Sequence, residues 1–165
     1  MHGGRQHGLT LAELLVVIAI VAILAGVVMP GFRDLVARNQ LSIAANDLVL
    51  AVNHARSEAT RRGQEVRVAA GATEASGASW EDGWRVVDGD GTTLRRFDPL
   101  PGRLTLTATD GITALRFSAQ GLLVTAEPVA LQLCLPGDSG RRVGIAATGR
   151  PTTARLEAGD CPAGG

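Results

Sequence analysis

The N-terminal part of the chain is dominated by one apolar run. Residues 9–29 read LTLAELLVVIAIVAILAGVVM, and Thr10 and Glu13 are the only polar residues among them. A bilayer core of about 30 Å is crossed by roughly 20 apolar residues in a helix. An ionised side chain within such a segment costs roughly 2.5–3.5 kcal/mol, so it normally marks function and has a partner. The pattern therefore predicts a membrane-spanning helix over residues 9–29 that carries one functional carboxylate.

A short polar leader, MHGGRQHG, precedes this run and ends at Gly8. A cut after Gly8 would create a positively charged amine on Leu9, one helical turn from Glu13. That amine, on the same or on a neighbouring chain, is the expected counter-charge of the carboxylate. Arg5 and the shortness of the N-terminal segment favour an orientation with the N-terminus inside the cell.

Three simpler interpretations of the apolar run compete with this one. A secretory signal peptide has an apolar core of about 7–15 residues and a small-residue cleavage site after it, whereas this run is longer and lacks such a site. A buried helix of a soluble protein is disfavoured because the run has no polar face. An ordinary signal anchor, with Glu13 present by chance, remains open.

The helical pattern continues beyond the run, through residues 30–63. Apolar residues recur there at spacings of mostly three or four, which is typical of one helix face. They are Phe32, Leu35, Val36, Leu41, Ala44, Ala45, Leu48, Val52, Ala55 and Ala59. Arg61 and Arg62 are expected in the last turn, with Gly63 as the cap. Pro30 lacks an amide donor and predicts a kink or a local break.

From residue 64 to residue 165 the pattern changes to short strands separated by turns. Residues 84–87 and 92–97 flank Asp-Gly-Asp-Gly at 88–91, a strong hairpin signal. The other strand candidates are the stretch around Val66 and Val68 and residues 103–109, 114–118, 122–125, 129–135 and 142–147. The predicted fold class is α+β, with a long N-terminal helix packed on an antiparallel β-sheet.

Composition and motifs restrict the function. The 16 Lys and Arg residues balance the 16 Asp and Glu residues, which argues against a wholly basic nucleic-acid binder but allows a local basic patch. The sequence has no nucleophile elbow, phosphate loop, HExxH motif or convincing carboxylate pair, so neither catalysis nor a cofactor is expected. Residues 88–91 lack the other ligands of a calcium loop, and no metal site is expected.

Residues 8–15, GLTLAELL, resemble the prepilin signature of type IV pilins and type II secretion pseudopilins. The resemblance implies that prepilin peptidase cleaves after Gly8 and methylates the new N-terminal Leu9, although the family usually has phenylalanine there. Glu13 becomes the fifth residue of the processed chain, where the family has its glutamate. Pro30 falls where many type IV pilins kink or melt the helix. Glu13 and Pro30 are therefore expected to act in filament assembly.

The rest of the chain resembles the GspH/FimT group of minor pilins and pseudopilins. The matching segments are NQL at 39–41, AANDL at 44–48, ARSEA at 55–59, RRG at 61–63, WEDGW at 80–84 and ATGR at 147–150. The resemblance implies a pilin-like fold and assembly with other minor and major pilins or pseudopilins. The expected parts are a leader (1–8), a transmembrane and filament-core helix (9–29), an amphipathic helix (30–63) and a periplasmic globular domain (64–165).

Members of this group often have two cysteine pairs, and Cys134 and Cys161 are the only cysteines here. In an oxidising periplasm, a disulfide that closes a loop of about 28 residues would stabilise the fold by roughly 3 kcal/mol. Two free thiols are the alternative. A zinc site is disfavoured because the two cysteines have neither CxxC spacing nor histidines nearby.

Four arginines near the C-terminus, Arg141, Arg142, Arg150 and Arg155, form a candidate DNA-binding patch around the turn at residues 149–151. In some FimT members a C-terminal basic segment with a Gly-Arg pair binds DNA during natural transformation, and Arg150 matches that pair. The arginine expected two positions later is Thr152, so Arg155 would have to replace it. Arginine–phosphate contacts predict weak, non-specific binding of double-stranded DNA. A solvated or salt-bridged arginine face is the competing interpretation.

The sequence thus predicts a minor pilin or pseudopilin, a low-abundance subunit that acts in filament initiation or at the filament tip. Before assembly it would be a single-pass inner-membrane protein with a periplasmic globular domain. The alternative function is DNA capture for natural transformation through the C-terminal arginines. The sequence leaves open whether the host machine is a type IV pilus or a type II secretion system.

Overall fold

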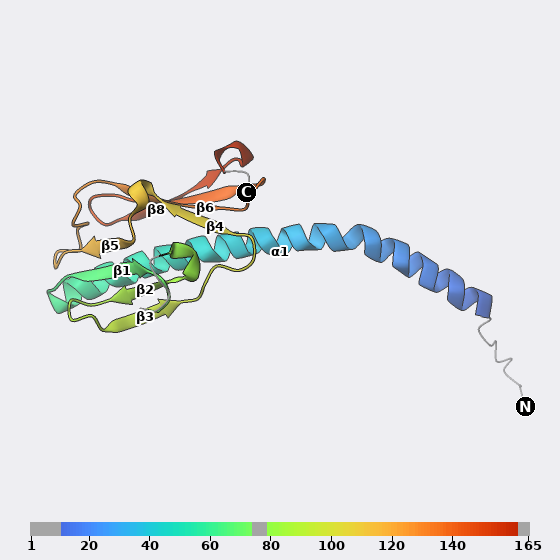
Figure 1. The fold of residues 1–165 in the computed structure, drawn as a ribbon, viewed down its shortest axis with the longest axis horizontal. Helices are drawn as coiled ribbons and strands as arrows, with labels where there is room; N and C mark the ends of the chain where they lie inside the picture. The colour runs from blue at the N-terminus through green and yellow to red at the C-terminus, as the bar shows by residue number, and fades with distance from the viewer. Residues whose placement is uncertain (1–10, 74–78, 162–165) are drawn as a thin grey trace, which may run out of the picture. The chain divides into compact units, whose positions relative to one another are not determined.

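The computed structural model describes residues 11–73 and 79–161, without the side chains of residues 25–31 and 158. The chain forms two compact units, Met1–Val36 and Ala37–Gly165. Helix α1 (Leu11–Arg62) contributes to both units, and the strands belong to the second (Figure 1). The predicted fold class, a long N-terminal helix with antiparallel β-structure, is confirmed.

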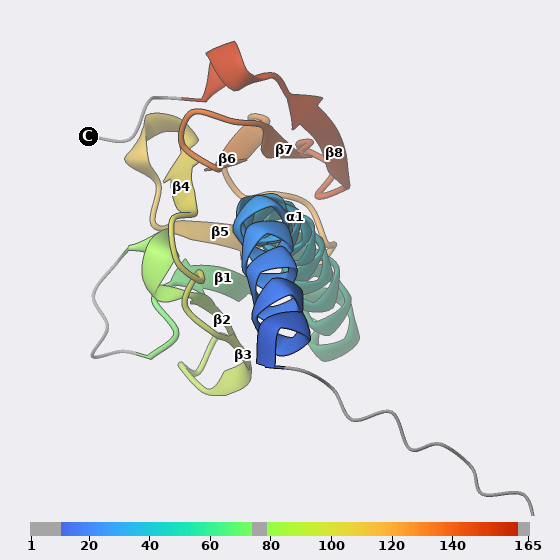
Figure 2. The same cartoon turned by 90° about the vertical axis from the view of Figure 1, so that its right-hand side faces the viewer.

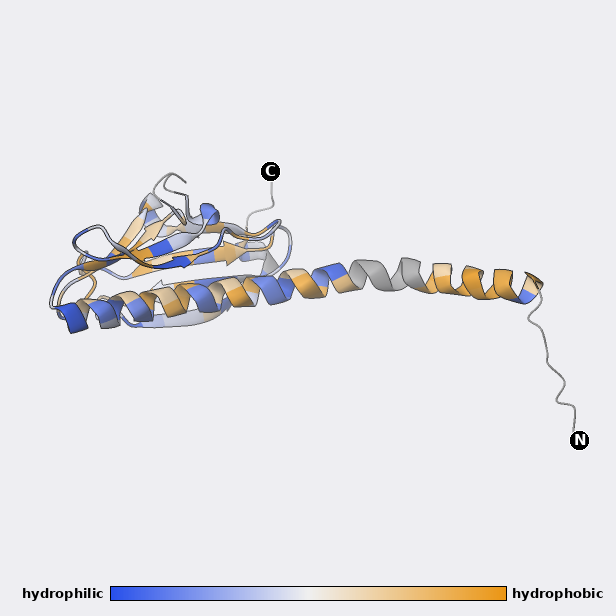
Figure 3. Cartoon of the chain, turned by 90° about the horizontal axis from the view of Figure 1, so that it is seen from below, coloured by the Kyte–Doolittle hydropathy of each residue, from blue (hydrophilic) through white to orange (hydrophobic). Residues whose placement is uncertain are grey.

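In the first unit, α1 exposes apolar side chains on all its sides. Every side chain of residues 11–24 is exposed, and Figure 3 shows this stretch as hydrophobic almost throughout. Among the described residues, no helix is both long and apolar enough to cross a membrane. The span predicted from the sequence also includes residues 9 and 10 and the side chains of residues 25–29, which lie outside the described ones. It stays a prediction.

Helix α1 continues through Pro30 without interruption, so the predicted local break does not occur, and the alternative, a kink, stays a prediction. A proline removes one backbone hydrogen bond, but helix formation is cooperative, and the residues on both sides propagate the helix.

The buried face of α1 starts later than the sequence predicted. Phe32 and Leu35 are 61% and 65% exposed, so they do not belong to it. That face begins at Leu41, because the core is built from residues of the second unit alone.

In the second unit, α1 buries a face built mainly of alanine. Its buried residues are Leu41, Ala44, Ala45, Leu48, Ala51, Val52, Ala55 and Ala59. Alanine favours the helix, and its small side chain lets the strands come close. The helix ends at Arg62, and Gly63 follows with a φ of 65°, a left-handed conformation that glycine adopts easily. The predicted end of the helix is therefore confirmed.

Two antiparallel sheets of four strands share the core with this helix. The first sheet has the order β3-β2-β1-β5, and the second has the order β4-β6-β7-β8. The strands are β1 (Val66–Ala70), β2 (Trp84–Val87), β3 (Thr93–Phe97), β4 (Thr105–Ala108), β5 (Ala114–Phe117), β6 (Val129–Cys134), β7 (Gly140–Ile145) and β8 (Pro151–Leu156). Figure 2 shows the strands of the two sheets on different sides of α1. The sequence predicted the antiparallel arrangement but not the division of the strands between two sheets.

The strand predictions fail at two places. Residues 122–125 do not form a strand, and Leu123 makes only an isolated bridge with Phe117. The sequence analysis also missed β8. Its residues 152–155 are exposed, because β8 lies at the edge of its sheet and has no alternation of buried and exposed positions. An edge strand also tolerates Pro151 at its first position.

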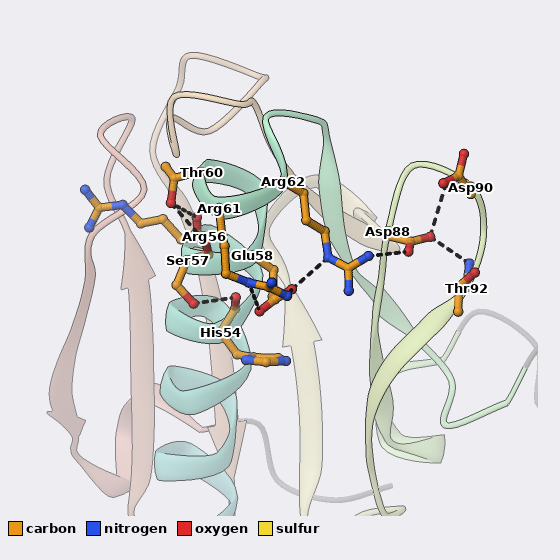
Figure 4. A network of polar contacts seen from close by, with 10 residues as sticks. All are labelled: His54, Arg56, Ser57, Glu58, Thr60, Arg61, Arg62, Asp88, Asp90 and Thr92. Carbon is orange, nitrogen blue, oxygen red and sulfur yellow. Dashed lines mark hydrogen bonds and ion pairs between the residues drawn. The ribbon is translucent and has the colours of Figure 1, made fainter.

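A polar network joins the end of α1 to the β2–β3 hairpin (Figure 4). Glu58 accepts hydrogen bonds from Arg61 and Arg62, and Arg62 Nη1 also donates to Asp88 Oδ2 at 3.1 Å. Asp88 is only 4% exposed, and its Oδ1 accepts the backbone N–H of Thr92 at 2.8 Å. This carboxylate therefore closes the predicted hairpin turn while Arg62 compensates its charge.

Candidate functional site

The first candidate site is the N-terminal end of α1. Gly8 and Leu9, the predicted cleavage and methylation positions, lie outside the described residues. Glu13 lies in the first turn of α1, where a negative charge interacts favourably with the helix dipole, and it is exposed. The side chain of Pro30 is not described. The roles of these four residues in processing and assembly stay predictions.

The second candidate site lies on the β7–β8 hairpin, which carries the four C-terminal arginines. Arg141 in β7 lies directly opposite Arg155 in β8. Val143 and Ile145 are buried, and side chains alternate along a strand, so Arg141 lies on the core-facing side of the sheet. Arg142 lies on the other side. The hairpin thus brings two of the four arginines together.

Arg141 and Arg155 line a cleft of about 440 Å³ that also includes residues of α1 and of the β6–β7 turn. Arg141 Nη2 donates to Ser42 Oγ at 3.4 Å, and Arg38 Nε donates to Asp138 Oδ2 at 3.0 Å. The hydrogen bond from Arg38 holds the pKa of the Asp138 carboxyl below its usual range. The cleft therefore contains both charge signs.

Arg150 lies at the opposite end of the hairpin. It precedes Pro151, the first residue of β8, whereas Arg155 is near the end of that strand. Five residues of extended chain span roughly 16 Å. The prediction that all four arginines gather around the turn is therefore wrong. The length of β8 separates Arg150 from Arg155, and Arg142 lies on the opposite side of the sheet from Arg141.

Gly149 holds the turn that carries Arg150 close to the end of α1. Its φ is 76°, and a Cβ there would collide with the carbonyl oxygen of Gly121 and lie 3.3 Å from Arg56 Cδ. Arg56 Nε in turn donates to the same Gly121 oxygen at 3.2 Å. Only glycine fits this close approach, which gives the Gly-Arg pair a structural role independent of any ligand.

Cys134 and Cys161, the two cysteines singled out in the sequence, form a disulfide with a Cα–Cα distance of 5.5 Å. It joins the last residue of β6 to the residue after the short helix η4 (Ala158–Asp160). Both cysteines are buried, and a Cβ at Gly140 would lie only 2.5 Å from Cys161 Sγ. The disulfide therefore holds the segment after β8 against the second sheet.

The described residues of these sites bring charged and polar side chains together. Over residues 11–73 and 79–161, no group of His, Cys, Asp and Glu side chains is arranged to hold a metal ion. The C-terminal hairpin gathers guanidinium, hydroxyl and carboxylate groups, which pair charges and bind anions. The described residues thus offer surfaces for recognising a partner.

The sequence analysis missed a second group of arginines, on the first sheet. Arg67, Arg85, Arg96 and Arg116 lie in four different strands and become neighbours only through the strand register. The local signal was an arginine among apolar residues in each strand, which is typical of any solvent-facing strand position. The register between distant segments was needed to find them.

The fold and the N-terminal helix define a class of proteins, the pilin-like subunits, in which a long helix leads into an antiparallel β-domain. Two family models match the chain: Type II transport protein GspH over residues 44–149, and the prokaryotic N-terminal methylation motif over residues 3–29. The GspH match covers well over half of the chain. The chain therefore belongs to the GspH family of minor pilins and pseudopilins, a family of structural subunits.

Solved structures agree with this family. The type IV minor pilin FimU of Pseudomonas aeruginosa is 28% identical, with a TM-score of 0.60, over 76% of this chain and 94% of its own. The minor pseudopilin EpsH of the Vibrio cholerae type 2 secretion system has a TM-score of 0.50 over 73% of this chain and 98% of its own. At 18% identity, EpsH supports the fold alone.

Sequence relatives match over a shorter stretch. The fimbrial protein EcpC of Eikenella corrodens is 54% identical over 41 residues, and a fimbrial protein of Pseudomonas aeruginosa is 39% identical over 61 residues. The chain spans only 27% and 39% of the lengths of these two proteins. The activity and partners of these whole relatives therefore do not carry over directly to this chain.

Proposed function

We propose that this protein is a low-abundance subunit of a type IV pilus or of a type II secretion pseudopilus, acting in filament initiation or at the filament tip. The likeness to the minor pilin FimU over 94% of that chain carries the proposal. The match to the N-terminal methylation motif supports it, because that motif precedes the GspH match in the same chain.

The proposed maturation begins with prepilin peptidase, which cleaves after Gly8 and methylates Leu9. Before extraction into a filament, the protein would be anchored in the inner membrane by residues 9–29, with the second unit in the periplasm. The disulfide between Cys134 and Cys161 supports this location, since disulfides persist in oxidising compartments.

In the filament, Glu13 would pair with the N-terminal amine of a neighbouring pilin or pseudopilin. The support is the position of Glu13 in the first turn of α1, where it is the only charged residue of a stretch that exposes Leu11, Leu14 and Leu15. A carboxylate surrounded by apolar groups interacts strongly with an opposite charge because little water screens the pair. This interaction would set the register between subunits.

The test is the variant Glu13→Ala, compared with Asp34→Ala, which removes an exposed carboxylate elsewhere on the same helix. We expect Glu13→Ala to remain in the membrane fraction but to be lost from sheared filaments, and Asp34→Ala to appear in both. Normal incorporation of Glu13→Ala would contradict the proposed amine–carboxylate pairing. Deletion of the gene tests the host machine, since it would impair either surface pili or protein secretion.

A second candidate function is DNA capture by the C-terminal arginines, carried by the same filament. The observation in its favour is the direct opposition of Arg141 and Arg155, which concentrates positive charge at one end of the hairpin. The arginines Arg142 and Arg150 are both exposed. We expect Arg141→Glu/Arg155→Glu to abolish DNA retention while filament assembly is kept, because these two arginines lie opposite each other. Unchanged DNA retention would count against this function.

A further inference from the structure

We propose that the solvent-facing side of the first sheet is a binding surface for the phosphate backbone of duplex nucleic acid. We call it the arginine face, and it consists of Arg67 in β1, Arg85 in β2, Arg96 in β3 and Arg116 in β5. It lies on a different sheet from the C-terminal arginines. It does not depend on the filament role proposed above.

The alternation of side chains places all four arginines on one side of the sheet. In β1, β2 and β5 both neighbours of the arginine are buried in the core, in β3 one of them is, and the arginine lies on the opposite side. The buried neighbours are Val66 and Val68 in β1, Trp84 and Val86 in β2, Phe97 in β3, and Leu115 and Phe117 in β5. The face therefore extends over the whole first sheet, whose strands contain no acidic residue.

The strand register brings these arginines into two directly opposed pairs. Arg85 lies opposite Arg96, and Arg67 lies opposite Arg116. The two pairs are adjacent, because Arg85 is also opposite Ala69, two residues from Arg67. Like charges directly opposite each other destabilise a sheet. Two such pairs side by side disfavour folding, and a bound polyanion would relieve their repulsion.

Two of the four guanidinium groups are held by the protein. Arg116 Nε is 2.7 Å from Glu65 Oε1, in the one ion pair that the described residues give this face. Arg85 Nη1 donates to the carbonyl oxygens of Gly71 at 2.8 Å and Thr73 at 3.0 Å. These contacts fix the positions of both groups and leave most of the positive charge of the face uncompensated.

The other two guanidinium groups are available to a ligand. Within residues 11–73 and 79–161, Arg67 and Arg96 make neither an ion pair nor a side-chain hydrogen bond. Arg96 is exposed and Arg67 is half-buried. A guanidinium binds a phosphate through two parallel hydrogen bonds, which makes these two side chains the primary contacts of the proposed surface.

The absence of apolar anchors among the described residues of this face favours a phosphate backbone over a protein partner. The apolar side chains between the arginines, Val87 and Ala69, are only 1% and 8% exposed. Protein–protein interfaces depend on aromatic or aliphatic anchors at their centre, whereas contacts to a nucleic-acid backbone need mainly cations and hydrogen-bond donors. The arginine face offers cations and hydrogen-bond donors, as a nucleic-acid backbone requires.

The dimensions also suit a duplex. Three gaps between neighbouring strands, each about 4.8 Å, give the face a width of about 14 Å from β3 to β5. Duplex DNA carries one charge per about 1.7 Å of its axis. A duplex lying on the face would therefore present several phosphates to the arginines at once, without any readout of base sequence.

The test is a salt titration of the full chain in detergent micelles with a fluorescent duplex DNA of random sequence. We expect Arg67→Gln/Arg96→Gln to weaken binding at least about tenfold at low salt and to reduce the slope of log K against log salt by about two, because each phosphate contact contributes about 0.9. Arg67→Lys/Arg96→Lys keeps both charges and should keep the slope. That variant keeps the proposal testable if the glutamine variant fails to fold.

The control is Arg33→Gln/Arg103→Gln, which removes the same charge from two exposed residues outside the face. It should leave the slope nearly unchanged, and an equal loss in both glutamine variants would overturn the proposal. So would the absence of DNA binding, binding of polyglutamate in place of DNA, or loss of DNA binding only when the opposed C-terminal arginines Arg141 and Arg155 are replaced. Filament incorporation of the variants, measured in parallel, tests the filament role separately.

Discussion

Glu58 accepts hydrogen bonds from Arg61 and Arg62. These hydrogen bonds, the one from Arg61 most strongly, lower the pKa of its carboxyl from 4.5 to about 2. A carboxyl whose pKa is lower in the folded state stabilises the fold above the pKa of the unfolded chain and loses this contribution as the pH falls through the folded value. Glu58 therefore stabilises the helix end above about pH 4.5, and the effect disappears toward pH 2.

The variant Glu58→Gln should therefore be less stable than the parent at neutral pH, and the difference should vanish as the pH falls from 4.5 toward 2. Urea unfolding at a series of pH values measures this. Glu127→Gln, at an exposed carboxylate without an ion pair among the described residues, controls for the loss of charge alone. A difference that stays constant with pH would contradict the role of Glu58.

Gly149→Ala should destabilise the second unit more than Gly137→Ala does. Both glycines have a φ of 76°, but a Cβ at Gly137 meets nothing within 4 Å, whereas one at Gly149 collides with the Gly121 carbonyl oxygen. The left-handed conformation alone costs roughly 1–2 kcal/mol for alanine, and overpacking adds roughly 1–3 kcal/mol. Thermal unfolding of the two variants separates these contributions, and equal losses would show that the close approach is unimportant.

Among the elements, the end of the second sheet depends on the disulfide. Removing it by Cys134→Ala/Cys161→Ala should lower the free energy of unfolding by roughly 3 kcal/mol, because the unfolded chain loses a loop constraint. Urea unfolding with and without reductant measures the effect. Reductant should destabilise the parent and leave the double variant unchanged. A double variant as stable as the oxidised parent would contradict this role.

Element prediction from sequence succeeded where the signal is local. The Asp-Gly-Asp-Gly turn and its flanking apolar residues identified β2 and β3, and Arg61, Arg62 and Gly63 identified the end of α1. It failed for β8, because an edge strand exposed on both faces has no alternation to detect. It also failed for residues 122–125, because the apolar residues there lie in a turn, although their composition is typical of a strand.

For the whole molecule, the division into two units makes a prediction about folding. All residues of the hydrophobic core lie between Leu41 and Ile145, within the second unit. A fragment of residues 37–165 should therefore unfold cooperatively, with a midpoint close to that of the full chain in detergent. Circular dichroism during heating measures both midpoints, and the lack of a cooperative transition in the fragment would contradict the independence of the second unit.

The sequence by itself determined the local features of this protein: the apolar N-terminal run with Glu13, the family motif, the helix end, the hairpin and the presence of two cysteines. These features depend on residues close together in the chain, so periodicity and turn chemistry identify them. The tertiary structure decided that the strands form two sheets, that Arg141 meets Arg155 away from Arg150, and that four arginines share one face. These relations depend on strand register, because a shift of one residue moves a side chain to the opposite face of the sheet.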